Sequence, residues 1–231
     1  MRRSRSSRGL RLTQRGLSLV ELMVGITVGL FIVAAAAMLV TTQLGDNRRL
    51  LLETQVQQDL RATADIITRE LRRAGYWAGA QQSYWYPASS TGIPKNPRAA
   101  VSMTGLDEVS YAYDRDINNS GPYGFKLESG RVKSFLGGSW QELTDWNVLR
   151  VTALNIAEQD GPSALLPCPR ECVGGGTACW PTLTVRELVV TITGQAAHDA
   201  AVQRTVSSRV RLRNDLVAFN DAANPNDICP R

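Results

Sequence analysis

The sequence contains only one histidine and lacks the residue sets that most enzymes use for catalysis. His198 stands in a polar stretch between two β-rich runs, where a surface loop is the better interpretation. The glycines at 174–176 are not followed by Lys-Ser or Lys-Thr, so they do not form a phosphate-binding loop. No Ser/His/Asp or Cys/His combination has a convincing orienting partner. We therefore expect no catalytic residue and no cofactor, and we do not expect an enzyme.

Acidic residues are absent from the first 16 positions, although the chain as a whole contains 21 of them. The same segment holds six arginines: Arg2, Arg3, Arg5, Arg8, Arg11 and Arg15. The chain of 231 residues has a net charge of +5, and subtracting these six charges leaves −1 for residues 17–231. The basic character therefore belongs to a leader and not to a folded surface. We expect no nucleic-acid partner for the folded body.

Residues 17–40 form a long apolar run with a single charge, Glu21. As a helix rising about 1.5 Å per residue, the run spans roughly 36 Å, enough to cross a bilayer core. The arginines before it favour a cytoplasmic N-terminus and a body on the far side of the membrane. A secretory signal peptide or an ordinary signal anchor would also contain such a run. However, no small-residue cleavage site follows it at residues 41–43, whereas Gly16 directly precedes it.

Glu21 is the informative residue of this run. A carboxylate inside an apolar span costs roughly 2–4 kcal/mol on insertion scales, so such a residue is a functional candidate. Standing alone, it could be an acid near the interface whose side chain reaches water. It does not stand alone, because an arginine leader, Gly16, the apolar run and Glu21 follow one another at fixed spacing.

Residues 15–22, RGLSLVEL, resemble the class III signal of the type IV pilin and pseudopilin family. The resemblance implies that a prepilin peptidase in the inner membrane cuts between Gly16 and Leu17. It also implies N-methylation of Leu17, although the family usually has phenylalanine at this position. A carboxylate in lipid needs a cationic partner, and the new amine of Leu17 provides one. In the family's proposed mechanism, Glu21 of one subunit meets that amine on a neighbouring subunit, so the expected partners are major and other minor pilins.

Residues 46–79 contain no proline and are rich in good helix formers. Apolar side chains recur there at spacings of three and four, which places them on one face of a helix: Leu52, Val56, Leu60, Ala64, Ile67, Leu71, Ala74 and Ala78. The pattern predicts one helix over residues 17–79, with a possible kink at Gly45-Asp46 and a stop at Gly79. A coiled-coil stalk is the alternative, but the apolar stripe is short.

The remaining sequence is rich in strand signals. Alternating or β-branched runs occur at 109–114, 131–136, 139–143, 148–156, 183–193 and 205–213, and Gly137-Gly138 predicts a two-residue hairpin turn. We expect an α+β fold in which the amphipathic half of the long N-terminal helix packs on an antiparallel β-sheet, as in pilins. The predicted divisions are a cleaved leader at 1–16, the transmembrane and amphipathic helix at 17–79, and a periplasmic β-rich domain at 80–231.

The four cysteines, Cys168, Cys172, Cys179 and Cys229, all lie in the C-terminal third. An even number of cysteines outside the cytoplasm favours two disulfides, with three possible pairings. We favour pairings in which Cys168 and Cys172 are not joined to each other. A zinc site is the alternative, but the spacing fits no common zinc motif.

Oxygen side chains also alternate at Asp114, Asp116 and Asn118, as at the start of a calcium loop. Since the sixth and twelfth positions of that loop do not fit, a polar turn explains these residues better.

Several body segments are similar to PilW-like minor pilins: residues 65–79, YGFKL at 123–127, WQELTD at 140–145 and VRLRN at 210–214. The resemblance implies a minor pilin that helps to initiate assembly of a type IV pilus, in a tip complex with other minor pilins. Before assembly, the protein would cross the inner membrane once, with its body in the periplasm. One alternative is a J-type minor pseudopilin of type II secretion. From another class, the alternative is a membrane-anchored periplasmic enzyme or binding protein.

Overall fold

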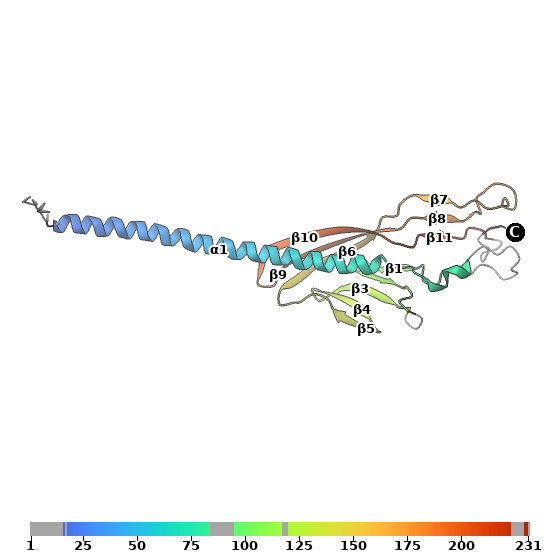
Figure 1. Cartoon of the computed structure of the whole chain (residues 1–231), viewed down its shortest axis with the longest axis horizontal. Coiled ribbons are helices and arrows are strands. Elements are labelled where there is room, and N and C mark those ends of the chain that lie inside the picture. The colour runs from blue at the N-terminus through green and yellow to red at the C-terminus, as the bar shows by residue number, and fades with distance from the viewer. Residues whose placement is uncertain (1–15, 17, 84–94, 117–119, 223–228, 231) are drawn as a thin grey trace, which may run out of the picture. The chain divides into compact units, whose positions relative to one another are not determined.

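The computed structural model describes residue 16 and residues 18–83, 95–116, 120–222 and 229–230 (Figure 1). The chain divides into two compact units, residues 1–49 and residues 50–231. Helix α1 (Leu19–Leu71) contributes residues to both units, and all of the strands belong to the second. The amphipathic half of the helix therefore belongs to the same compact unit as the strands.

Helix α1 runs through Gly45 and Asp46 without interruption and ends at Leu71, eight residues before the predicted stop. Beyond Leu71 the backbone tightens into a turn in which the Ala74 N–H donates to the Leu71 carbonyl, and Gly75 then adopts a φ of +77°. The chain leaves the helix here because the Gly75 N–H binds the carbonyl of Ala112, far away in sequence. A separate 3₁₀-helix, η1 (Ala78–Ser83), follows.

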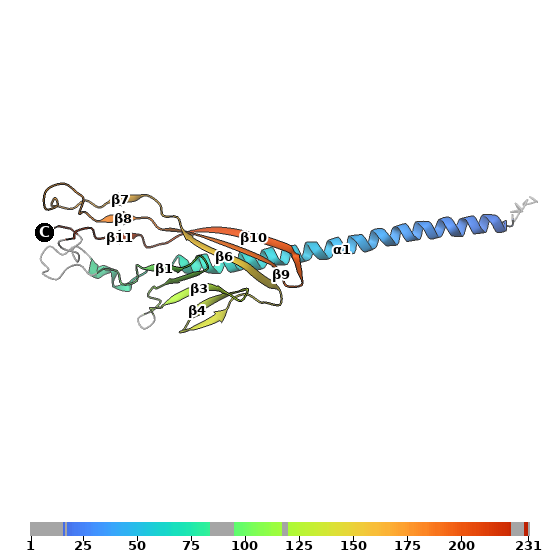
Figure 2. The same cartoon turned by 180° about the vertical axis from the view of Figure 1, so that it is seen from behind.

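The strands form three antiparallel sheets instead of the single sheet that we expected (Figures 1 and 2). The five-stranded sheet has the order β1 (Val101–Thr104), β2 (Glu108–Tyr111), β3 (Tyr123–Glu128), β4 (Arg131–Leu136) and β5 (Ser139–Glu142). The second sheet has the order β10 (Asp199–Arg211), β9 (Glu187–Ala196) and β6 (Leu149–Glu158). The third has the order β11 (Leu216–Ala218), β8 (Thr182–Thr184) and β7 (Ser163–Leu165).

Two strand predictions need correction. The run at 183–193 is not one strand, because β8 and β9 are separate and belong to different sheets. Strand β10 begins at Asp199, six residues before the predicted start, since residues 199–204 complete a hairpin with β9 through an irregular register. Few β-branched residues occur at 199–204, so the sequence pattern did not predict that the strand begins there. The Gly137-Gly138 turn is confirmed, with φ angles of 62° and 85°.

The core of the second unit lies between α1 and the sheets. The helix buries Val56, Leu60, Ala64, Ile67 and Leu71 in one cluster with side chains from β2, β3, β4, β6, β9 and β10. On β9, a Cβ atom at Gly194 would come within 2.7 Å of Leu149 and 3.2 Å of Leu60, so a glycine permits this close approach of helix and sheet. The fold is α+β and pilin-like, as predicted.

Candidate processing and assembly site

The site begins where the leader meets the helix. Gly16 is exposed, and a side chain at this position would meet no atom within 4 Å. Leu17 lies outside the described residues. Helix α1 starts two residues later, and the Ser18 carbonyl accepts a hydrogen bond from the Leu22 N–H at 3.1 Å. Among the described residues, the space around Gly16 is therefore open.

Glu21 is the third residue of α1 and the acidic residue of its first turn. A carboxylate is favoured there, because the unpaired N–H groups at a helix N-terminus carry partial positive charge. Glu21 is exposed and is four positions after Leu17.

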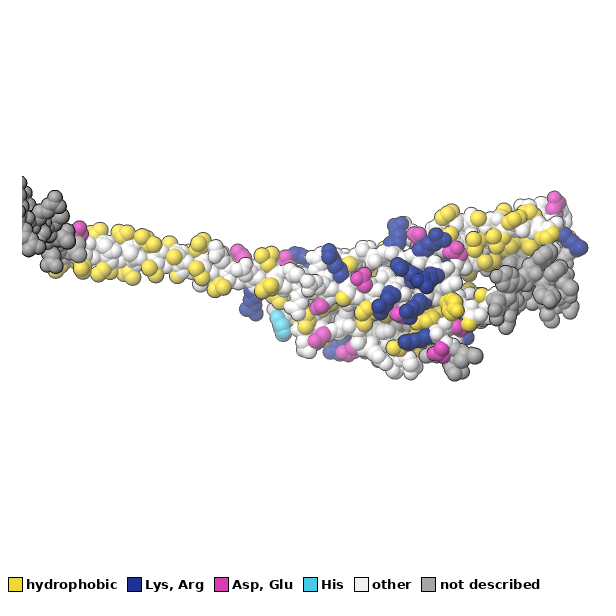
Figure 3. Space-filling view, in the orientation of Figure 1, with side chains coloured by type: hydrophobic (Ala, Val, Ile, Leu, Met, Phe, Trp, Pro, Cys, Tyr) yellow, Lys and Arg dark blue, Asp and Glu magenta, His cyan; other side chains and the backbone are white. Residues whose placement is uncertain are grey.

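The helix that follows Glu21 exposes its apolar side chains, and Figure 3 shows them along the face in view. Exposure reaches 74% at Leu19 and 78% at Phe31, and the most apolar 18-residue window has a mean hydropathy of 2.5. By length and composition, α1 is the one described helix that could cross a membrane. The hydroxyls of Thr27, Thr41 and Thr42 donate to carbonyls of the preceding turn, so these polar groups do not need water.

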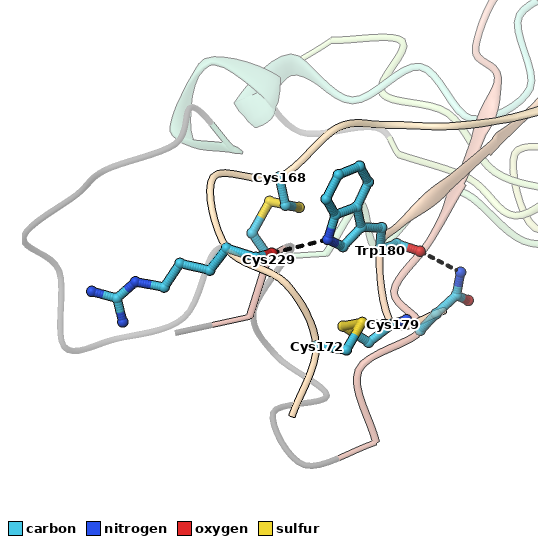
Figure 4. The surroundings of a disulfide bond; sticks show 7 residues. Cys168, Cys172, Cys179, Trp180 and Cys229 are labelled. Carbon is cyan, nitrogen blue, oxygen red and sulfur yellow. Dashed lines mark hydrogen bonds between the residues drawn. A yellow bond between two sulfur atoms is a disulfide. The ribbon is translucent and has the colours of Figure 1, made fainter. Parts of the chain in front are cut away.

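A second feature lies at the opposite end of the sequence, where two disulfides join Cys168 to Cys229 and Cys172 to Cys179 (Figure 4). Both Cα–Cα distances, 5.6 and 5.7 Å, are normal for a disulfide. Two bridges were expected, and Cys168 and Cys172 are indeed not joined to each other. The first bridge closes a loop with a sequence separation of 61, so it ties the C-terminus to the loop after β7.

Hydrogen bonds hold the same loop in place (Figure 4). The indole N–H of Trp180 donates to the Arg170 carbonyl at 2.9 Å. The Asn220 side chain donates to the Trp180 carbonyl and to the Thr182 hydroxyl, both at 2.8 Å. The loop that contains three consecutive glycines is thereby fixed to β8 and to the segment after β11 as well as by its disulfides.

The candidate calcium residues have other roles or lie outside the description. Asp114 forms an ion pair with Arg98 at 3.0 Å and accepts a hydrogen bond from the Ala78 N–H at 2.9 Å. Asp116 is exposed, and Asn118 lies outside the described residues. Within the part of the chain that the structure describes, no group of three or more His, Cys, Asp or Glu residues could hold a metal ion. Asp114 therefore connects the segment after β2 to the start of η1 through this hydrogen bond.

His198 occupies the turn between β9 and β10 and is exposed, as expected for a surface loop.

The sequence did not indicate an ion pair between Glu53 of α1 and Arg204 of β10. It also did not indicate the contacts of Glu70, which accepts a hydrogen bond from the Tyr113 hydroxyl at 3.0 Å and pairs with Arg73 at 3.3 Å. Burial raises the pKa of Tyr113, so the phenol stays protonated and donates. The Glu70–Arg73 pair is a local i,i+3 contact, whereas no local pattern links Glu53 to Arg204 or Glu70 to Tyr113.

Two protein-family models match the chain. Residues 11–37 match the prokaryotic N-terminal methylation motif, which covers the leader junction and the first part of α1. Residues 49–212 match the model of the family described as prepilin peptidase-dependent protein B. That match covers well over half of the chain and includes the amphipathic half of α1 and most of the strands. Neither a curated protein nor a solved structure matches the chain.

Proposed function

The chain belongs to the prepilin peptidase-dependent protein B family and is a type IV pilin-like protein, and from this premise we propose that it is a minor pilin. In this proposal it is made as a precursor, cut between Gly16 and Leu17, methylated on Leu17, and built into a type IV pilus. Its role is structural: it helps to initiate pilus assembly in a tip complex with other minor pilins. The body is periplasmic before assembly.

One observation carries the proposal: an apolar helix without protein cover has a single acid one turn from the expected new chain end. Apolar side chains from Leu19 to Leu44 are exposed, so they need lipid first and other apolar helices later. Gly25 and Gly29 are one turn apart with nothing within 4 Å, which permits close helix packing. The same segment thus suits both a membrane anchor and a helical filament core.

Charge pairing gives this assembly its register. Glu21 in an apolar environment is costly unless a cation neutralises it. The amine of Leu17 in a neighbouring subunit is such a cation. It enters the apolar core beside Glu21 only when the two helices are staggered along the filament axis. Addition of a subunit in the correct stagger therefore removes two unpaired charges at once.

The arginine leader and the disulfides support the proposed orientation. Six arginines before the apolar run favour a cytoplasmic N-terminus. Both disulfides lie on the other side of the apolar run in the sequence, and disulfides persist in an oxidising compartment such as the periplasm. The sequence similarity to PilW-like proteins at residues 65–79 favours a pilus over a secretion pseudopilus, with a J-type minor pseudopilin as the second candidate.

Mass spectrometry of the N-terminus of the membrane-extracted protein tests this function. The expected mature chain begins at Leu17 and has one added methyl group. A chain that still begins at Met1, or one that begins after residue 40, would contradict the proposal. Deletion of the gene then separates the two candidates, because a minor pilin is needed for surface pili and a pseudopilin for protein secretion.

A further inference from the structure

A groove of about 270 Å³ lies in the second unit, between the end of α1 and the five-stranded sheet. One side is formed by Ile66 and Glu70 of α1 and by Arg73 in the turn after it, and the sheet side includes Phe125 and Leu136. The cover given by the helix decreases from β3 toward β5. In one cross-strand row, Phe125 is buried, its neighbour Ser134 is half-buried, and the next neighbour Gln141 is exposed. The groove is the part of the inner sheet face that α1 does not cover.

Aromatic rings and a neutralised carboxylate form one wall of the groove. Tyr111 and Tyr123 line it directly, and the rings of Tyr123 and Tyr113 stack at a centroid distance of 4.4 Å. Glu70 already binds Tyr113 and Arg73, so its negative charge is satisfied within the chain. Leu136 remains 38% exposed at the other side. An incoming side chain would therefore contact apolar surface without meeting an unpaired acid on this wall.

Arginines stand along the edge of the groove. Arg73 and Arg115 line it, and Arg69 lies about one helical turn before Arg73 with its side chain 71% exposed. Glu142, the other acid of the lining, is paired with Arg131. Figure 3 shows basic side chains gathered around the C-terminal end of α1. Glu70 pairs with Arg73 and also lies 4.0 Å from Arg69, so it balances one of the three positive charges. The edge of the groove keeps a net positive charge and carries guanidinium groups, which bind carboxylates through two parallel hydrogen bonds.

The rest of the body has the opposite charge. Residues 50–231 contain 18 basic and 19 acidic residues. Without the three arginines and Glu70, 15 basic and 18 acidic residues remain, a net charge of −3. A long polyanion such as a nucleic acid, or an anionic membrane surface, would be repelled by this remainder. A short acidic segment that reaches only the groove would not be.

We propose that the groove binds a segment of a neighbouring pilin-type subunit that presents an apolar side chain beside one or more carboxylates. This inference rests on the proposed function, since filament assembly brings such subunits together. The apolar side chain fills the space between Ile66 and Leu136, and the carboxylates pair with Arg69 and Arg115. The contact is formed by the bodies, so it adds a site of recognition to the packing of the apolar helices.

Site-specific photocrosslinking in the native host tests the proposal on the full chain. A photoreactive benzoyl-phenylalanine is placed at Leu136 in the groove or, as a control, at Val173, which is 93% exposed elsewhere. The expected result is a crosslink from position 136 to a processed pilin-type subunit, mapped by mass spectrometry to a segment with an Asp or Glu within a few residues. Position 173 should not give that crosslink.

Charge reversal identifies the role of the arginines. The double variant Arg69→Glu, Arg115→Glu should reduce the crosslink about tenfold or more, because a charged hydrogen bond contributes roughly 1.5–3 kcal/mol. The matched variant Arg61→Glu, Arg170→Glu reverses two other exposed arginines and should leave it unchanged. Formation of both disulfides and resistance to protease confirm that each variant is folded. If the first variant does not fold, Gln141→Trp replaces it. Gln141 is exposed on β5 and lines the groove, so a tryptophan there fills the groove and should also remove the crosslink.

Three outcomes overturn the proposal: a crosslink that persists after charge reversal, no crosslink from position 136, or a crosslink from there only to lipid, nucleic acid or a protein outside the pilin class. The proposed function has a separate readout in the same cells. If that function fails, the leader stays attached or the chain is missing from isolated pili. If only the groove proposal fails, processing and recovery in pili are normal.

Discussion

The two halves of helix α1 differ in what their apolar side chains contact. In the second half, Leu60 and Ile67 are fully buried against the sheets of the same chain. In the first half, Leu30 and Phe31 are 64% and 78% exposed. The first half is apolar around its whole circumference, whereas the second is apolar on one face only. An apolar side chain in the second half thus stabilises the fold, and one in the first half acts only through surroundings outside the chain.

Replacement of Gly16 should have the largest effect, because cleavage after this residue would create the free amine that precedes α1. Gly16→Leu puts a bulky side chain at the cleavage junction, and we expect the arginine leader to stay attached to essentially all of the protein. The measurement is the mass of the membrane-extracted chain. A shortened chain would show that processing does not depend on this glycine. Gly45→Leu, within α1 and far from the junction, is the matched control and should be processed normally.

Loss of the charge at Glu21 should leave processing intact and impair assembly. Glu21→Val removes the proposed partner of the Leu17 amine, so we expect at least a tenfold lower amount of the protein in isolated pili. Asp65→Val removes an exposed acid from the second half of the same helix and should have little effect. The measurement compares membrane and pilus fractions by immunoblot. Normal incorporation of Glu21→Val would argue against charge pairing.

Removal of the long-range disulfide should destabilise the second unit more than removal of the short one. From loop length alone, the Cys168–Cys229 bridge contributes on the order of 4 kcal/mol and the Cys172–Cys179 bridge on the order of 2–3 kcal/mol. Paired Cys→Ser variants, compared by thermal unfolding of the detergent-solubilised chain, measure the difference. Equal effects of the two pairs would show that loop closure does not explain their contributions.

Truncation of matched leucines compares the two halves of α1 directly. Leu60→Ala leaves a cavity in the core, and we expect a loss of about 3 kcal/mol in the free energy of unfolding of the second unit. Leu30→Ala removes the same atoms from an exposed position and should leave that free energy unchanged. Urea unfolding followed by tryptophan fluorescence measures both. A similar loss for both variants would contradict the separation of the two units.

The smallest predicted effect concerns Glu128, whose pKa is lowered to about 2 by hydrogen bonds from Lys133 and Lys126. A lowered pKa in the folded state stabilises the protein above the unfolded pKa of about 4.5, and this contribution is lost as the pH falls toward 2. Glu128→Gln should slightly lower the melting temperature at pH 7 and make no difference near pH 2. Because Glu128 is exposed, the change should be small. Calorimetry at both pH values measures it.

Much of the fold could be predicted because its signals are local. The stripe from Val56 to Leu71 and the glycine pair at 137–138 each depend on residues close together in sequence. Strands β1, β7 and β11 had no clear pattern of their own, since each has only three or four residues. Strand β3 was not predicted either, although Tyr123, Phe125 and Leu127 alternate in it with residues that are not hydrophobic. The end of α1 at Leu71 was also missed, because it depends on a hydrogen bond between Gly75 and the distant Ala112.

The sequence by itself determined the leader junction, the apolar helix and the position of Glu21, because spacing along one chain is enough to define them. Only the tertiary structure decided which cysteines are joined, how the strands divide into three sheets, and that arginines border a groove beside α1. These features join residues that are tens of positions apart. Their proximity follows from packing of the whole core, and no single segment encodes it.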